Sequence, residues 1–204
     1  MRRLEGKKSE KNSKFAADMS LKEYMEGIAF ELAKLHILHG AEFTQQLENI
    51  TLRKEFVLVS GETDIYSAES ETDDDFEALL NAARKAVERG YRVFILPNPK
   101  LIRTADVILE RKGLFRMYDV KTIQGKTSVL NRLVESIGQT NHVLLNMNTQ
   151  YNSRLLAFQI KRYFEVNPDA AEVLIFKGKQ TFSIKRSYAK KKAFVQLFSQ
   201  EYGK

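Results

Sequence analysis

Between residues 20 and 40, apolar side chains recur three or four positions apart, which is the spacing of one face of a helix. Ser20 followed three residues later by Glu23 matches a capping box, and Gly40 is expected to end or bend the helix. The apolar stripe consists of Leu21, Met25, Ile28, Ala29, Leu32, Leu35 and Leu38. This helix would be either a separate appendage or a cover for a sheet.

The rest of the chain alternates between extended and helical patterns. An apolar run at 56–60 predicts a strand, and 61–72 is expected to be a polar loop. The elements expected after this loop are, in order, a helix at 76–87, strands at 91–96, 104–109 and 114–123, a helix at 127–137, a strand at 142–147, a helix at 153–164, strands at 172–176 and 181–185, and a helix at 187–202.

The two strands at 104–109 and 114–123 are separated by a turn of only four residues, which predicts an antiparallel hairpin. We expect residues 91–185 to form one central sheet. The order of elements indicates an α+β fold, in which a mixed or antiparallel sheet is flanked by helices and preceded by an N-terminal helical extension.

Three regions are expected along the chain. Residues 1–18 form a basic tail that is expected to be poorly ordered, residues 19–60 form the N-terminal helical region with its first strand, and residues 73–204 form the main α+β domain.

Composition and charge narrow the function classes. The chain is 43% apolar and 29% charged and has no cysteine, which excludes disulfides and thiolate metal sites. No apolar run is long enough for a membrane helix or a signal peptide, so we expect a cytoplasmic protein or a toxin delivered into a target cell. The net charge of +7 is concentrated at the C-terminal end, where eight Lys or Arg face one acid from residue 177 onward. This end could follow a phosphate backbone, or form a solvated surface helix.

The strand at 114–123 contains charges in an otherwise apolar run. Asp119 and Lys121 lie two residues apart, so they point to the same face of the sheet. Charged groups there are costly to bury unless they are paired, bind a metal or face a cleft. The hairpin brings Asp106 close to them. The pair is therefore a candidate site, and a purely structural ion pair is the alternative.

Polar residues follow the neighbouring elements. Gln139 and Asn141 lie at the junction between the helix at 127–137 and the next strand, where they could line the same site or simply form a turn. Lys126 and Ser128 lie before that helix, where amide and side-chain donors could hold a phosphate or merely cap the helix. The expected nucleic-acid contacts are Lys126, Ser128, Asn141, Lys177, Lys179, Lys185 and Arg186.

Residues 73–186 resemble the barnase/EndoU/colicin/RelE-type (BECR) nuclease toxins, in particular the tRNase-like C-terminal domains of contact-dependent inhibition toxins and related domains of phage head-morphogenesis proteins. The positions that carry the resemblance are Asp106, Asp119, Lys121, Thr122 and Gln139. It implies a ribonuclease toxin, with tRNA as the favoured substrate, a cognate immunity protein as a partner, and no metal cofactor. Lys121 would stabilise the phosphorane formed by attack of the ribose 2′-hydroxyl, and Thr122 and Gln139 would orient the phosphate.

The same letters also resemble the PD-(D/E)xK nucleases. Asp106 matches their first acid and Asp119-Val120-Lys121 their second motif, although Ala105 replaces the proline. In that case the two carboxylates would hold Mg²⁺. A third alternative is a non-catalytic nucleic-acid-binding module on a degenerate nuclease fold. We expect the metal-independent ribonuclease, with Asp106, Asp119, Lys121, Thr122 and Gln139 as its catalytic residues.

Overall fold

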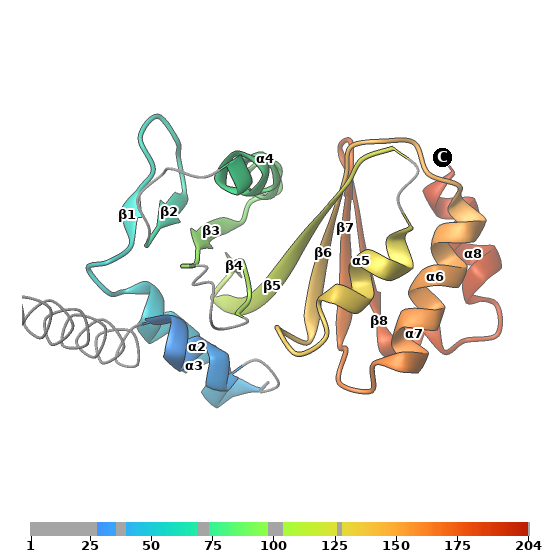
Figure 1. The fold of residues 1–204 in the computed structure, drawn as a ribbon, viewed down its shortest axis with the longest axis horizontal. Coiled ribbons are helices and arrows are strands. Elements are labelled where there is room, and N and C mark those ends of the chain that lie inside the picture. Colours follow the sequence, from blue (N-terminus) through green and yellow to red (C-terminus); the bar gives the residue numbers. More distant parts are fainter. Residues whose placement is uncertain (1–27, 36–39, 69–73, 98–103, 126–127, 204) are drawn as a thin grey trace, which may run out of the picture.

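The computed structural model describes residues 28–35, 40–68, 74–97, 104–125 and 128–203. Its centre is an eight-stranded mixed sheet in which every strand lies beside its neighbours in sequence (Figure 1). The strands are β1 (Val57–Leu58), β2 (Ile65–Ser67), β3 (Arg92–Ile95), β4 (Val107–Arg111), β5 (Leu114–Ile123), β6 (His142–Met147), β7 (Glu172–Lys177) and β8 (Gln180–Lys185).

Helices cover both faces of the sheet, and the expected α+β fold with an N-terminal helical part is confirmed. The helices are α2 (Ile28–Leu35), α3 (Ala41–Thr51), α4 (Asp74–Val87), α5 (Val129–Glu135), α6 (Ser153–Val166), α7 (Arg186–Ala189) and α8 (Phe194–Tyr202). Helix α4 packs on one face, against a core that includes Tyr118 and Val120 of β5. The other helices pack on the opposite face (Figure 1).

The long strand β5 joins two halves of the sheet. Its first half, from Leu114 to Tyr118, pairs with β4 in the antiparallel sense. Its second half, from Asp119 to Ile123, pairs with β6 in the parallel sense. The expected hairpin is therefore confirmed, as is one sheet across residues 91–185. β5 changes neighbour between Tyr118 and Asp119.

The tip of the β4–β5 hairpin is a two-residue turn. Lys112 and Gly113 both have positive φ, at 54° and 76°. This is the backbone of a type I′ turn, whose twist matches that of the flanking strands. A glycine at the second position adopts this conformation without a Cβ penalty, so the turn fixes the register of the hairpin.

Two separate apolar cores share the face of the sheet opposite α4. One lies under α2 and α3 and includes Phe115 and Met117 of β5. The other lies under α5, α6 and α8 and includes Ile123 of the same strand. Successive side chains of a strand alternate between faces, so Asp119 and Lys121 project from this face between the two cores. The charged pair thus occupies a break in the apolar cover.

Several expected elements differ from those observed. The strand expected at 56–60 is reduced to two residues, and β2 lies within the segment expected to be a loop. The C-terminal helix is interrupted between Ala189 and Phe194. The helix expected at 127–137 begins at Val129 and ends at Glu135. Helix α3 follows Gly40, whereas no second N-terminal helix was expected. The tail at 1–18 and the capping-box residues of the first helix lie outside the described residues.

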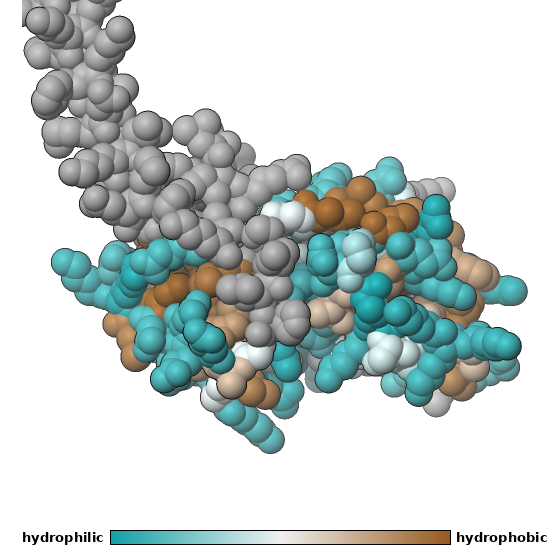
Figure 2. Space-filling view, turned by 90° about the horizontal axis from the view of Figure 1, so that it is seen from below, coloured by the Kyte–Doolittle hydropathy of each residue, from teal (hydrophilic) through white to brown (hydrophobic). Residues whose placement is uncertain are grey.

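The outer surface is largely hydrophilic and carries separate hydrophobic patches in the view from below (Figure 2). Exposed apolar side chains in the described ranges include Leu52, Val57 and Leu58 around β1, and Leu155 and Phe158 on α6. Among the described residues, no helix combines the length and apolar character required to cross a bilayer.

Candidate active site

Asp106 lies at the point where β4 begins and stops covering the edge of β5. Its backbone N–H donates to the carbonyl of Tyr118 at 3.0 Å, although Val107 is the residue in register with Tyr118. Two residues of one strand thus oppose one residue of the other, as in a β-bulge. The carboxylate Oδ2 of Asp106 accepts the N–H of Val120 at 2.6 Å. This side chain therefore replaces the strand that β5 loses there.

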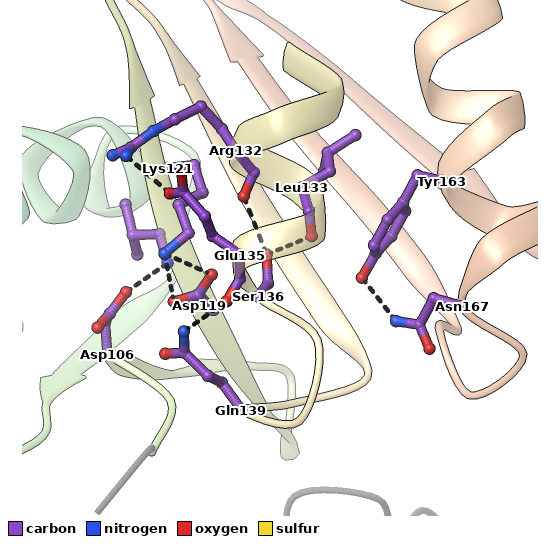
Figure 3. Close-up of polar contacts among 11 residues, drawn as sticks. Asp106, Asp119, Lys121, Arg132, Leu133, Glu135, Ser136, Gln139, Tyr163 and Asn167 are labelled. Carbon is purple, nitrogen blue, oxygen red and sulfur yellow. Dashed lines mark hydrogen bonds and ion pairs between the residues drawn. The ribbon is translucent and has the colours of Figure 1, made fainter. Parts of the chain in front are cut away.

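Asp119 and Lys121 form a buried ion pair on β5 (Figure 3). Nζ of Lys121 donates to Oδ1 of Asp119 at 3.0 Å and lies 3.0 Å from Oδ2 as well. The side chain of Asp119 is fully buried, and that of Lys121 is 12% exposed. Oδ2 of Asp119 accepts no hydrogen bond from any residue that the structure describes. A buried carboxylate oxygen with this spare capacity can bind a further positive group.

The site holds more negative than positive charge. Burial raises the pKa of Asp106 well above its usual range, and the negative charge of Asp119 raises it further. The Val120 N–H and the charge of Lys121 act in the opposite direction but do not cancel these effects. One ammonium group faces two adjacent carboxyl groups. A divalent cation would supply the missing positive charge.

The ligand set suits Mg²⁺ only if substrate and water complete it. No group of three or more His, Asp or Glu side chains that could bind a metal occurs within the described ranges. Mg²⁺ commonly takes one or two carboxylates together with phosphate oxygens and water. The main chain provides one more candidate ligand: Ile123 turns its carbonyl toward Asn148 after β6, so the alternation along β5 turns the carbonyl of Val120 away from β6, on the side of Asp106.

The structure does not bring Thr122 to this group. It follows Lys121 directly, so its side chain lies on the α4 face of β5, where its Oγ1 accepts a hydrogen bond from Nδ2 of Asn146 at 3.4 Å. Gln139 is half-buried, and its Nε2 donates to the carbonyl of Glu135 at 2.9 Å, which closes the end of α5 (Figure 3). Of the five expected catalytic residues, Asp106, Asp119 and Lys121 converge.

Two of the expected nucleic-acid contacts hold the fold together. The guanidinium of Arg186 donates to the carbonyls of Phe164, Asn167 and Ala170 at the end of α6, so its donors are used within the protein. Nζ of Lys177 donates to the carbonyl of Tyr202 and lies 4.3 Å from the centre of its ring.

The remaining expected contacts differ in accessibility. Asn141 is buried, and its carbonyl accepts the N–H of Ala171 at 2.7 Å. Ser128 occupies the N-cap of α5, but its side chain makes no capping hydrogen bond. Lys179 and Lys185 are exposed, so they stay available to a ligand. Lys126 lies outside the described residues.

A second polar cluster, on the α4 face, was not expected from the sequence. Nζ of Lys85 donates to the side-chain oxygens of Asn146 and Asn148 at 2.6 and 2.5 Å, and Nδ2 of Asn146 donates to Asn81 at 3.1 Å. Partial burial lowers the pKa of Lys85, and the nearby Arg89 adds to this effect. The cluster fastens α4 to the ends of β5 and β6. Its members are scattered along the sequence and share no motif, so no sequence signal marked them.

No protein-family profile matches the chain, and no curated protein matches it. Among solved structures, the chain is similar to a chain of the CdiA-CT/CdiI toxin and immunity complex from Burkholderia pseudomallei, at 15% identity and a TM-score of 0.36. The match covers 57% of this chain and 92% of the other. A TM-score of this size is too low to assign either a shared fold or a function, and the chemistry of the site has to be judged on its own geometry.

Proposed function

We propose that this protein is a nuclease of the PD-(D/E)xK type that hydrolyses nucleic-acid phosphodiester bonds with the help of a divalent cation. The observation that supports it is the convergence of Asp106, Asp119 and Lys121 at the point where β5 changes neighbour. Two carboxyl groups and one ammonium group there are drawn from a short hairpin whose register is fixed by its turn.

Each residue has a separate task in this proposal. Asp106 and Asp119 would hold the cation, which supplies a Lewis acid that activates water and neutralises the scissile phosphate. Lys121 is oriented by its ion pair with Asp119, and its ammonium can donate to a phosphate oxygen that gains charge in the transition state. The Val120 N–H fixes the direction of the Asp106 carboxylate. The backbone bond thus prepares the ligand before substrate arrives.

The geometry gives less support to the metal-independent reaction favoured by the sequence. That reaction needs several uncharged or cationic donors around the phosphate. Thr122 lies on the other face, and Gln139 is engaged with the end of α5. The hydroxyl of Thr140 donates to the carbonyl of Met117 at 3.2 Å. Among these candidates only Lys121 remains, and two carboxyl groups beside it would repel a phosphorane that has no cation.

The test is cleavage by the purified protein with and without a divalent cation. tRNA, rRNA, single-stranded DNA and double-stranded DNA are each incubated in EDTA, and then in EDTA with excess Mg²⁺ or Mn²⁺. We expect no cleavage in EDTA, recovery with the added cation, and products without 2′,3′-cyclic phosphate ends. The Asp119→Asn variant should be inactive. The Asp169→Asn variant, which changes an exposed aspartate outside the site, should cleave normally.

Two other results would redirect the assignment. RNA cleavage that persists in EDTA and leaves cyclic phosphate ends would establish the metal-independent reaction. A protein that binds nucleic acid but cleaves none of the four substrates would be a non-catalytic binding module. tRNA as the substrate, an immunity protein as the partner and delivery into a target cell stay predictions from the resemblance, and the tRNA reaction tests the first of them.

A further inference from the structure

A second group of basic side chains surrounds a cavity on the face of the β4–β5 hairpin opposite Lys121. The cavity has a volume of about 320 Å³, and its lining includes Tyr91, Arg111, Lys112, Leu114, Arg116 and Tyr118. The register of the hairpin sets Arg111 opposite Leu114, and Leu109 opposite Arg116. Directly opposed residues share a face of the sheet, so the two arginines point to the same side. Tyr118 shares that face and belongs to the α4 core.

The three cations of this cavity have no counter-ion. Arg111, Lys112 and Arg116 form no ion pair with any carboxylate in the described parts of the chain. The guanidinium of Arg111 lies 5.2 Å from the centre of the Tyr91 ring. Contact with an aromatic face orients a guanidinium but leaves its charge intact. Lys112 stands at the exposed tip of the type I′ turn, where its ammonium can reach solvent or a ligand.

The hydrogen bonds beneath the cavity turn its polar groups inward. The hydroxyl of Tyr118 donates to Oε2 of Glu172 at 2.8 Å, and the hydroxyl of Ser183 donates to Oε1 of the same carboxylate. Glu172 is only 6% exposed. The one acid near this cavity is therefore buried and already bonded, whereas the cations lie at its surface. An approaching ligand meets positive charge on an aromatic and aliphatic wall.

These features suit a phosphate-bearing polymer better than a small anion. A small-molecule site encloses most of its ligand, but Arg111 and Lys112 are exposed and the cavity is shallow at its tip. A polymer gains affinity from several weak contacts with exposed cations, through the release of its counter-ions. Lys185 also fits this role: it is in register with Glu172, so it lies on the same face, exposed and three strands from β5, about 14 Å away.

We propose that this cavity binds backbone phosphates of the nucleic-acid substrate at a distance from the cleaved bond. The assignment of that substrate rests on the proposed nuclease function. Arg116 and Lys121 are five residues apart on β5, which spans about 17 Å, and they lie on opposite faces. A bound strand would pass from one face to the other at the edge of β5 that β4 leaves uncovered. The site at Asp106 lies on this edge.

Binding is measured in EDTA, by fluorescence anisotropy of a labelled 20-nucleotide single strand, so that the result does not depend on cleavage. The test variant combines Arg111→Gln with Arg116→Gln. We expect its affinity to fall about tenfold, and the slope of log K against log salt to decrease by about 2, or about one for each lost phosphate contact. The matched control is Arg162→Gln, since Arg162 is an exposed arginine on α6 whose side chain is 62% exposed. It should bind as the wild type does.

The double variant Arg111→Lys with Arg116→Lys separates charge from folding. It keeps both cations, so it should keep the salt slope, and both double variants should melt within a few degrees of the wild type. An unchanged slope in the glutamine variant, or an equal loss of affinity in Arg162→Gln, would refute the cavity as a phosphate site. Displacement of the strand by ATP as strongly as by an unlabelled strand at equal phosphate concentration would refute the polymer as its ligand.

The two proposals fail separately. Slope-dependent binding by a protein that never cleaves would leave the cavity assigned and reject the nuclease. Cation-dependent cleavage with normal binding by the glutamine variant would do the reverse.

Discussion

Replacing Asp106 by Asn should stabilise the fold while it removes cleavage. The Asn side chain keeps an oxygen that can accept the Val120 N–H, whose bond to Asp106 is 2.6 Å long, and it removes one of two adjacent negative charges. Like charges facing each other across strands cost about 0.2–1 kcal/mol, and burial adds to this cost, so we expect a gain of about 1 kcal/mol at pH 8. For a chain of this length, that raises Tm by about 2–4 °C.

The pH dependence of this gain identifies its cause. Burial and Asp119 raise the pKa of Asp106 in the folded protein, so the folded state keeps a proton that the unfolded chain has already lost. The stability of the wild type therefore falls as the pH rises from the ordinary aspartate pKa to the raised one. The Asp106→Asn variant lacks this titration. Its advantage should be small at pH 5 and larger at pH 8.

Thermal unfolding in EDTA, followed by circular dichroism at pH 5 and pH 8, measures both effects. Asp169→Asn is the control, because its carboxyl group is exposed and its loss should shift neither Tm. Addition of Mg²⁺ should then raise Tm for the wild type and not for Asp106→Asn, since only the wild type keeps both carboxylates. A variant that is less stable than the wild type at pH 8, or equally shifted at both pH values, would refute the repulsion between the carboxyl groups.

Three further substitutions test other parts of the structure. Lys121→Ala should lower the free energy of unfolding by about 3 kcal/mol, because it strips a fully buried Asp119 of its cation, and Asp119→Asn in the same chain should restore most of this in urea titrations. Tyr118→Phe should cost about 1–2 kcal/mol in the same titrations, because Glu172 loses a donor, while the cleavage rate stays unchanged. Arg186→Ala should lower Tm clearly but leave nucleic-acid affinity unaltered, since its donors bond carbonyls within the protein.

The central hairpin and its charged pair could be predicted because both depend on short-range rules. Alternation with a period of two set Asp119 and Lys121 on one face, and the short turn before Leu114 set Asp106 nearby. The same alternation puts Thr122 on the face opposite Lys121. The match to a motif concealed this, because a motif counts positions in sequence and does not distinguish the two faces of a strand.

Other features depend on contacts that the local sequence does not encode. Arg186 sits in a basic run that indicates a surface, and only the packing of α7 against the end of α6 turns its guanidinium to three carbonyls. β2 is three residues long, too short for a periodic pattern, and exists because β1 and β3 pair with it. Helix α3 did carry a signal, since Phe43, Leu47 and Ile50 recur at helical spacing and all are buried.

The exchange of neighbours along β5 has a consequence for how the protein opens. The strands before β5 and those after it meet only through this one strand, so each half can act as a separate cooperative unit in native-state hydrogen exchange. Amides of β3 and β4 would then exchange at a different free energy from those of β6 and β7. Asp106 belongs to the first unit, and Asp119 and Lys121 pair with the second. A partial opening that releases either unit separates the carboxyl groups, so the active form would be lost before the chain unfolds.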